Sequence, residues 1–289
     1  MKGITTGQIK MNIAVLSGKG GTGKTMVSVN LARIAVPSVY VDCDVEEPNG
    51  HLYFKPEDVV CEEVSVLVPK SDPDKCNGCR ECVRFCRFNA LVFSLDRLTV
   101  FNDMCHSCGG CSVICPQEAI TEYPRTIGHL ELGRSGDVYV RTGIMNIGEV
   151  AGSPIISRLL DVNTSPKKGI TFIDCPPGSS CMVMESIKDA DFCLLVTEPT
   201  IFGTHNLKMV VELVTEFDKP FGVILNKTVE GEADPSEEYC LENHIPIIGR
   251  IPFDRELSNL TSEAKIASEE SVRFENLFQS ILDNISEMV

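Results

Sequence analysis

Two runs of four cysteines with identical spacing constrain this chain more than any other feature. The first run is Cys76, Cys79, Cys82 and Cys86, and the second is Cys105, Cys108, Cys111 and Cys115. Both read C-x2-C-x2-C-x3-C, and each cysteine of the second run lies 29 residues after its counterpart in the first. Thiolates at this spacing bind 4Fe–4S clusters, with three ligands from one run and the fourth from the other. The sequence therefore predicts a small unit held together by two clusters.

The crossover of the fourth ligand predicts which cysteines share a cluster. One cluster is expected on Cys76, Cys79, Cys82 and Cys115, and the other on Cys105, Cys108, Cys111 and Cys86. Two zinc ions or disulfides are the alternatives, but the x2-x2-x3 rhythm is not a usual zinc pattern. The motif resembles bacterial two-cluster ferredoxins over about residues 70–123. One departure is Arg87, which stands where proline would follow Cys86 and is expected to alter a turn, not the ligation.

A second motif lies near the N-terminus, where residues 18–25 fit G-x-x-x-x-G-K-S/T. It follows an apolar run, Ile13–Leu16, and precedes a helical stretch, Met26–Ala35. Glycines let the backbone curl so that its N–H groups face phosphate oxygens at a helix N-terminus. Lys24 is expected to reach the β- and γ-phosphates of ATP, and the Thr25 hydroxyl to bind Mg2+. The expected nucleotide-binding residues here are Gly18, Gly20, Gly21, Thr22, Gly23, Lys24, Thr25 and Met26.

An extra lysine, Lys19, gives the loop the form K-G-G-T-G-K-T. This form resembles the deviant Walker motif of the MinD/ParA family and of the nitrogenase iron protein. The resemblance implies that Lys19 reaches across a dimer to the partner's nucleotide, in an ATP-sandwich homodimer or a heterodimer with a sister ATPase. The alternative is a solvated loop lysine.

Carboxylates follow two further predicted strands, where parallel sheets bind ligands. Residues 42–49 resemble the family's switch I, which implies that Asp42 belongs to the Mg2+ shell and that Asp44 orients or deprotonates the attacking water. Capping of a turn is the alternative role for this pair. Residues 173–178 resemble switch II, which implies that Asp174 reaches Mg2+ and that Gly178 offers its N–H to the γ-phosphate. Further resemblance lies at 196–200, at Asn226 (adenine recognition in relatives) and at 251–254, where Pro252 is expected beside the nucleotide.

The alternation of apolar strands with helices predicts a doubly wound, mainly parallel α/β sheet of the P-loop NTPase type. The expected domains are a discontinuous ATPase domain, residues 1–69 and 124–289, and the ferredoxin-like α+β insert, residues 70–123. Residues 124–150 are expected to return to the sheet as a β-rich segment. The expected strands are 12–17, 38–42, 170–174, 192–197, 222–226 and 245–249, and the expected helices include 203–216, 235–243 and 271–288.

Composition narrows the possible partners and compartment. The net charge of −15 disfavours nucleic acid and anionic lipid as partners. No apolar run approaches the length of a membrane span, and the last helix is predicted to pack on the core. Without an apolar signal region, a cytoplasmic location is expected, with the cysteines outside the two runs as free thiols. Cys181 could alternatively bind a cluster shared by two subunits, whereas Cys43, Cys61, Cys175, Cys193 and Cys240 are expected to be small buried or loop residues.

The combined motifs suggest an ATPase coupled to redox chemistry. By resemblance to MinD-superfamily proteins, including Mrp-type cluster carriers, the favoured function is an ATP-switched dimer that carries or donates electrons for metal-cofactor or iron–sulfur assembly. It would act with a redox or cofactor-assembly protein partner. The alternatives are electron transfer to an unknown acceptor, similar to nitrogenase reductase, and a positioning or scaffold ATPase with redox-sensing clusters.

Overall fold

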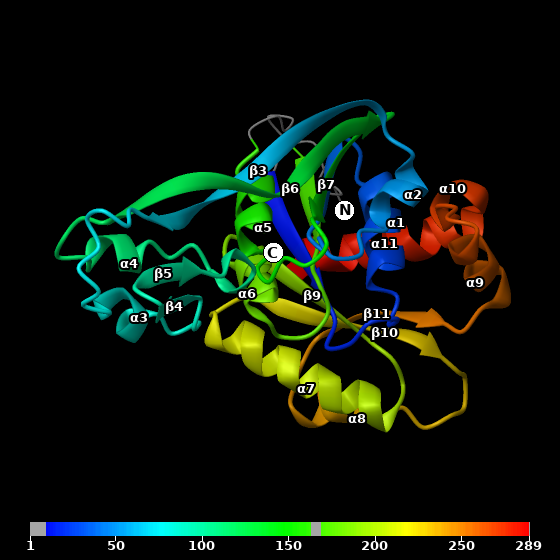
Figure 1. The fold of residues 1–289 in the computed structure, drawn as a ribbon. Coiled ribbons are helices and arrows are strands. Elements are labelled where there is room, and N and C mark those ends of the chain that lie inside the picture. Colours follow the sequence, from blue (N-terminus) through cyan, green and yellow to red (C-terminus); the bar gives the residue numbers. More distant parts are fainter. Residues whose placement is uncertain (1–9, 163–168, 289) are drawn as a thin grey trace.

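A single large sheet forms the centre of the protein (Figure 1). The structure, a computed structural model, describes residues 10–162 and 169–288. Within them the sheet has nine strands in the order β11-β10-β9-β1-β8-β2-β7-β6-β3. The strands are β1 (Lys10–Leu16), β2 (Ser38–Asp42), β3 (Glu57–Ser71), β6 (Ile120–Ser135), β7 (Val138–Met145), β8 (Gly169–Asp174), β9 (Phe192–Thr197), β10 (Phe221–Thr228) and β11 (Ile247–Pro252).

The strands from β11 to β7 are parallel, and β6 and β3 extend that edge in antiparallel pairing. Every residue of β2 and β9 is buried, which explains why these strands read as continuous apolar runs. The predicted doubly wound, mainly parallel sheet is thus confirmed. All six predicted strands are present, although the last runs over residues 247–252 instead of 245–249.

Helices cover both faces of the sheet, and each face has its own apolar core. On one face, the core lies between the sheet and the helices from the two ends of the chain. On the other face, the core lies between the sheet and the helices from the middle of the chain. The first group is α1 (Lys24–Ile34), α2 (Gly50–Phe54), α9 (Arg255–Ser262), α10 (Ala267–Glu270) and α11 (Val272–Met288). The second is α5 (Ser153–Leu160), α6 (Cys181–Ile187), α7 (Ile201–Glu216) and α8 (Pro235–Glu242).

The last helix packs on the core, as predicted. Phe274, Phe278, Ile281, Leu282 and Ile285 of α11 are all buried in the same core as α1. Among the described residues, none of the helices combines the length and apolar character needed to cross a membrane.

β3 and β6 form a long antiparallel ribbon. The sequence predicted that residues 124–150 are rich in β-structure, but it did not predict this ribbon. The ribbon pairs Glu57 with Arg134 at one end and Ser71 with Ile120 at the other. It extends from the sheet edge and carries the segment with the eight motif cysteines at its far end (Figure 1). The predicted domain boundaries, at 69/70 and 123/124, fall inside β3 and β6, so the division into two domains stays a prediction.

The segment at the tip of the ribbon, hereafter the cysteine module (residues 72–119), has short elements and a small core. Cys82, Leu91 and Cys111 form this core together with Ile120, the first residue of β6, and it is separate from the two cores of the sheet. A core this small suits a unit stabilised by bound ligands. Its elements are α3 (Glu81–Phe85), β4 (Leu91–Ser94), β5 (Arg97–Val100), a 3-10 turn at Asn102–Met104, and α4 (Gly110–Val113).

Candidate nucleotide site and cysteine cavities

The glycine-rich loop connects β1 to α1, as the motif predicts. Gly23, the residue before α1, has φ +96°, which L side chains rarely adopt. A Cβ atom there would also lie 2.3 Å from the Asn226 amide nitrogen. Glycine is therefore required at this position both by conformation and by space. The loop leaves Lys24 and Thr25 on the first turn of α1, with Lys24 buried and Thr25 half-buried.

Lys24 lies in the centre of a buried group of charges. Its Nζ is 2.6 Å from Asp174 Oδ1, and the Tyr40 hydroxyl donates to Asp174 Oδ2 at 2.9 Å. Burial works against the charged form of Lys24, but attraction to Asp174 outweighs it and raises the lysine pKa. Burial, and secondly the charge of Asp174, raises the pKa of Tyr40. The structure thus brings together Lys24 and Asp174, which are 150 residues apart in the chain.

Asp42 ends β2 and lies beside Asp174, because the two residues are register partners on neighbouring parallel strands. Its Oδ2 accepts from the backbone N–H groups of Asn49 (3.1 Å) and Gly50 (2.8 Å), and its Oδ1 from that of Asp44 (3.2 Å). Asp42 therefore does fix a turn, the alternative role considered from the sequence. Burial, and next the charge of Asp174, still raises the Asp42 pKa to about 7.

Asp44 is half-buried, and its pKa is raised to about 6, chiefly by burial, with Lys24 acting in the opposite direction. Three carboxylates, those of Asp42, Asp44 and Asp174, thus gather around one lysine. The raised pKa values of Asp42 and Asp44 show that their ionised forms are disfavoured here, and a divalent cation would stabilise those forms. Oxygen is also the ligand that Mg2+ prefers. The residues present fit a magnesium ion.

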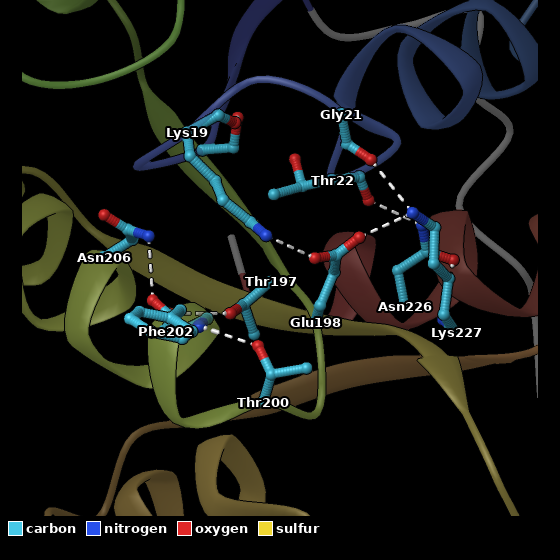
Figure 2. Close-up of polar contacts among 12 residues, drawn as sticks. Lys19, Gly21, Thr22, Thr197, Glu198, Thr200, Phe202, Asn206, Asn226 and Lys227 are labelled. Carbon is cyan, nitrogen blue, oxygen red and sulfur yellow. Dashed lines mark hydrogen bonds and ion pairs between the residues drawn. The ribbon is translucent and has the colours of Figure 1, made fainter.

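Lys19 is held within its own subunit (Figure 2). Its Nζ lies 2.7 Å from Glu198 Oε2, and Lys227 Nζ lies 2.5 Å from Glu198 Oε1. Lys227 also donates to the Gly21 carbonyl at 3.0 Å. Partial burial alone would raise the pKa of Glu198, but hydrogen bonds from the two lysines lower it below its usual value. Lys19 is therefore an ion-paired residue in this structure, not a freely solvated one.

Asn226, near the end of β10, contacts the glycine-rich loop and holds it in place (Figure 2). Its buried side-chain amide donates to the Thr22 carbonyl at 2.6 Å and accepts from the Lys227 N–H at 3.0 Å. A cavity of about 270 Å3 opens beside it, and Met26, Pro252 and Leu257 are among its lining residues. Asn226, expected at the adenine base, and Pro252, expected beside the nucleotide, thus both line a cavity next to the loop.

Comparison with known proteins agrees with this geometry. The family model described as "CobQ/CobB/MinD/ParA nucleotide binding domain" matches residues 13–266. The chain belongs to this family. Uncharacterized protein MJ0579 of Methanocaldococcus jannaschii is 30% identical over 75% of this chain and 80% of its own length. Uncharacterized protein MJ0578 of the same organism is 27% identical over 97% of this chain and 98% of its own length.

Solved structures share the fold. The cell division ATPase MinD of Pyrococcus furiosus superposes with a TM-score of 0.59 at 18% identity, covering 97% of this chain and 100% of that one. The septum site-determining protein MinD of Pyrococcus horikoshii, complexed with Mg-ADP, superposes with a TM-score of 0.57 at 19% identity, covering 94% of each chain. At such identities the likeness shows the fold, and the chain is an α/β protein of the MinD/ParA P-loop NTPase type.

Gly178 follows β8 in the second switch-like segment of this MinD/ParA-type domain. Its N–H donates to the Ser17 carbonyl at 2.9 Å, and its φ of +90° requires glycine. In this conformation the N–H is engaged with the backbone at the start of the glycine-rich loop. An interaction of Gly178 with a γ-phosphate, which stays a prediction, requires that this hydrogen bond be broken.

The motif cysteines gather around two cavities in the cysteine module. Each cavity combines three cysteines of one run with the fourth of the other, and both are lined mainly by apolar atoms. Four thiols around an apolar cavity are a donor set that fits a 4Fe–4S cluster. The first cavity has Cys76, Cys79, Cys82 and Cys115, and the second has Cys86, Cys105, Cys108 and Cys111.

The structure also shows what sequence reasoning missed or misplaced. Glu198 follows β9, and Lys227 lies near the end of β10. Their positions directly after the predicted strands 192–197 and 222–226 were the signal in the sequence that could have identified them. Cys61 was expected to be a buried or loop residue, but it is exposed on β3. Cys43, Cys175, Cys193 and Cys240 are buried as expected, and Cys181 is exposed at the start of α6.

Proposed function

We propose that this chain is an ATP-hydrolysing iron–sulfur protein. In this proposal, ATP switches a dimer that carries or donates electrons for metal-cofactor or iron–sulfur cluster assembly, together with a redox or cofactor-assembly partner. One observation carries it: two cavities, each lined by three cysteines of one run and one of the other, lie on an arm of a MinD/ParA-type nucleotide-binding domain.

The nucleotide chemistry follows from the charges around the loop. ATP phosphates would bind at the N-terminus of α1. Lys24 would then leave its ion pair with Asp174 and contact phosphate oxygens instead. Thr25, Asp42 and Asp174 are the residues that would hold Mg2+. Asp44, with a pKa near 6, is suited to orient the attacking water and to accept its proton near neutral pH. The complex of the P. horikoshii relative with Mg-ADP supports the choice of nucleotide and metal.

The dimer in this proposal depends on Lys19. To reach the nucleotide of a partner subunit, Lys19 must leave Glu198, so the ion pair seen here would belong to the resting subunit. Binding energy from the partner's phosphates would then favour the closed dimer. Because M. jannaschii has two relatives of this chain, a heterodimer of sister chains is the form to test beside the homodimer.

The cysteine module would supply the redox part of the function. When bound there, 4Fe–4S clusters accept and release single electrons. The module is attached to the sheet edge through β3 and β6, and β6 pairs with β7, the neighbour of the strand that ends at Asp42. A movement of the segment after Asp42 could therefore shift the ribbon, and with it the module, relative to a partner protein.

The test is an electron-transfer assay on anaerobically reconstituted, reduced protein of measured iron content. We expect faster oxidation by the partner protein, identified by anaerobic pull-down, with ATP than without nucleotide. Lys24→Ala should lose this stimulation while keeping its iron. If a non-hydrolysable ATP analogue accelerates this oxidation as much as ATP does, nucleotide binding without hydrolysis is sufficient for electron transfer. A nitrogenase-reductase-like protein would instead require hydrolysable ATP. Self-association that responds to ATP with no effect on electron transfer would contradict the proposal and favour a scaffold ATPase.

A further inference from the structure

A second group of metal-binding side chains lies on the β3–β6 ribbon. The Cys61 thiol, a His129 ring nitrogen and a Glu131 carboxylate oxygen all lie within 4.8 Å of one another. We propose that these three residues bind one divalent transition-metal ion of the zinc class. The site is distinct from both the nucleotide site and the cysteine cavities, and nothing in the MinD/ParA-type motifs calls for it.

The pairing of the two strands brings these residues together. Cys61 and Glu131 are direct cross-strand partners, and His129 is two residues from Glu131, so all three side chains stand on one face of the ribbon. Five consecutive pairs, from Val60↔Leu132 to Val64↔Gly128, keep one register around this point, and a register shift lies on either side of them. A paired antiparallel ladder holds their Cβ positions, so the three donors are largely preorganised for one ligand.

The donor set indicates the kind of ion. One sulfur, one imidazole nitrogen and one carboxylate oxygen suit zinc, which accepts all three and often keeps a fourth position for water. A hard ion such as Mg2+ or Ca2+ would not select a thiol and an imidazole. His129 Nε2 is 3.7 Å from Glu131 Oε1, beyond hydrogen-bond distance and close to the separation of two ligands on one tetrahedral ion.

The surroundings favour a cation and allow it to enter. Cys61 is exposed, and His129 and Glu131 are half-buried. Glu63, the cross-strand partner of His129, stands on the same face and adds a second carboxylate. Its Oε2 now accepts from the Thr126 hydroxyl at 3.3 Å, a weak contact that could be exchanged for the ion. An exposed thiol would otherwise be open to oxidation, and metal binding would protect it.

The distance from the nucleotide site follows from the sheet register. Asp42 pairs with Thr142, Thr142 with Glu131, and Glu131 with Cys61, so these residues form one row across β2, β7, β6 and β3. Three strand spacings separate Asp42 from Cys61, or roughly 14 Å between their backbones. An ion at the ribbon therefore cannot share ligands with one bound at Asp42.

Zinc loading of the full-length, anaerobically reconstituted protein tests the proposal. Competition with a chromophoric chelator should reveal one tight zinc per chain in addition to the iron. Cys61→Ser, His129→Gln and Glu131→Gln should each weaken this zinc by at least about tenfold, since even partners of metal ligands affect affinity by that much. Iron content should not change. His205→Gln, which removes an exposed imidazole elsewhere, is the matched control.

X-ray absorption at the zinc edge separates this site from the cluster motifs. We expect one sulfur at about 2.3 Å and nitrogen or oxygen neighbours at about 2.0 Å. A zinc surrounded by four sulfurs, a zinc affinity unaffected by Cys61→Ser, or no zinc retained on iron-loaded protein would each overturn the proposal.

Discussion

At the scale of single residues, the nucleotide site is organised by charges that are shared between partners. Glu198 accepts from two lysines, Lys19 of the glycine-rich loop and Lys227 of β10. Lys24 likewise faces three carboxylates, of which Asp174 is its direct partner. In the proposed function, the phosphates of ATP and a cation would displace contacts of this kind.

Glu198→Gln should make the ATP-bound dimer easier to form, because it weakens the hold on Lys19 inside its own subunit. A partly exposed ion pair contributes up to about 1 kcal/mol, so we expect the dimer dissociation constant to fall by up to about fivefold. Analytical ultracentrifugation with a non-hydrolysable ATP analogue measures it. Glu185→Gln, which removes the ion pair with Lys188 at the end of α6, is the control. A weaker dimer would show that Glu198 supports closure instead of restraining it.

Asp42 predicts a pH dependence of stability in the absence of Mg2+ and nucleotide. Because its pKa is raised to about 7, the folded state binds this proton more tightly than the unfolded state does. The stabilising contribution of protonated Asp42 is complete at low pH and is lost as pH rises through about 7. The free energy of unfolding in urea should therefore fall from about pH 5.5 to about pH 7.5, and less so in Asp42→Asn.

The control for this measurement is Asp283→Asn, an exposed aspartate on α11. It should keep the pH slope of the unaltered protein. Added Mg2+ should flatten the slope in the unaltered protein and leave Asp42→Asn nearly unchanged. An identical slope in Asp42→Asn and in the unaltered protein would remove Asp42 as its source.

At the scale of elements, α11 illustrates how an amphipathic helix secures the sheet. Phe278 is fully buried between α11 and the strands, whereas Val272 of the same helix is 70% exposed. Phe278→Ala should lower the free energy of unfolding by about 3–5 kcal/mol, since it deletes a large core side chain. Val272→Ala should change it by less than about 0.5 kcal/mol. Urea denaturation monitored by circular dichroism compares them, and equal losses would contradict the core role of α11.

The elements differ in how far sequence alone predicts them. Strands buried on both faces, such as β2 and β9, stand out as apolar runs, and α11 stands out by its apolar stripe. The 15 residues of β3 carry no such pattern, because much of the ribbon lies beyond the helical layers and is exposed on both faces. Its register depends on pairing with β6, which is distant in sequence. Pairing of this kind leaves little local signal.

The candidate site was predictable where a motif fixes local geometry and not where contacts cross the fold. The glycine-rich loop, Asp42 and Asp174 lie together at the ends of neighbouring strands, as their positions after apolar runs indicated. By contrast, Glu198 and Lys227 acquire their roles only when β9 is placed beside β1 and β10 beside β9. Cys61 and His129 likewise come together only when β3 pairs with β6.

At the scale of the whole molecule, a nucleotide-binding sheet and a cysteine module are joined by one ribbon (Figure 1). The two cores of the sheet do not include the small core of the module. Ligand loss in the module should therefore leave the sheet folded. Cys79→Ser should lower iron content and leave nucleotide affinity within about twofold, as measured by calorimetry on the anaerobic protein. A variant that loses both would show that module and sheet fold as one cooperative unit.

The central claim is that one chain combines a nucleotide-driven switch with two iron–sulfur clusters. Iron, sulfide and zinc content of anaerobically purified full-length protein tests it most directly. The account predicts a brown protein with about eight iron and eight sulfide per chain, and about half that iron in Cys79→Ser. Colourless protein that holds zinc on the eight motif cysteines, and that anaerobic reconstitution with iron and sulfide does not change, would contradict it.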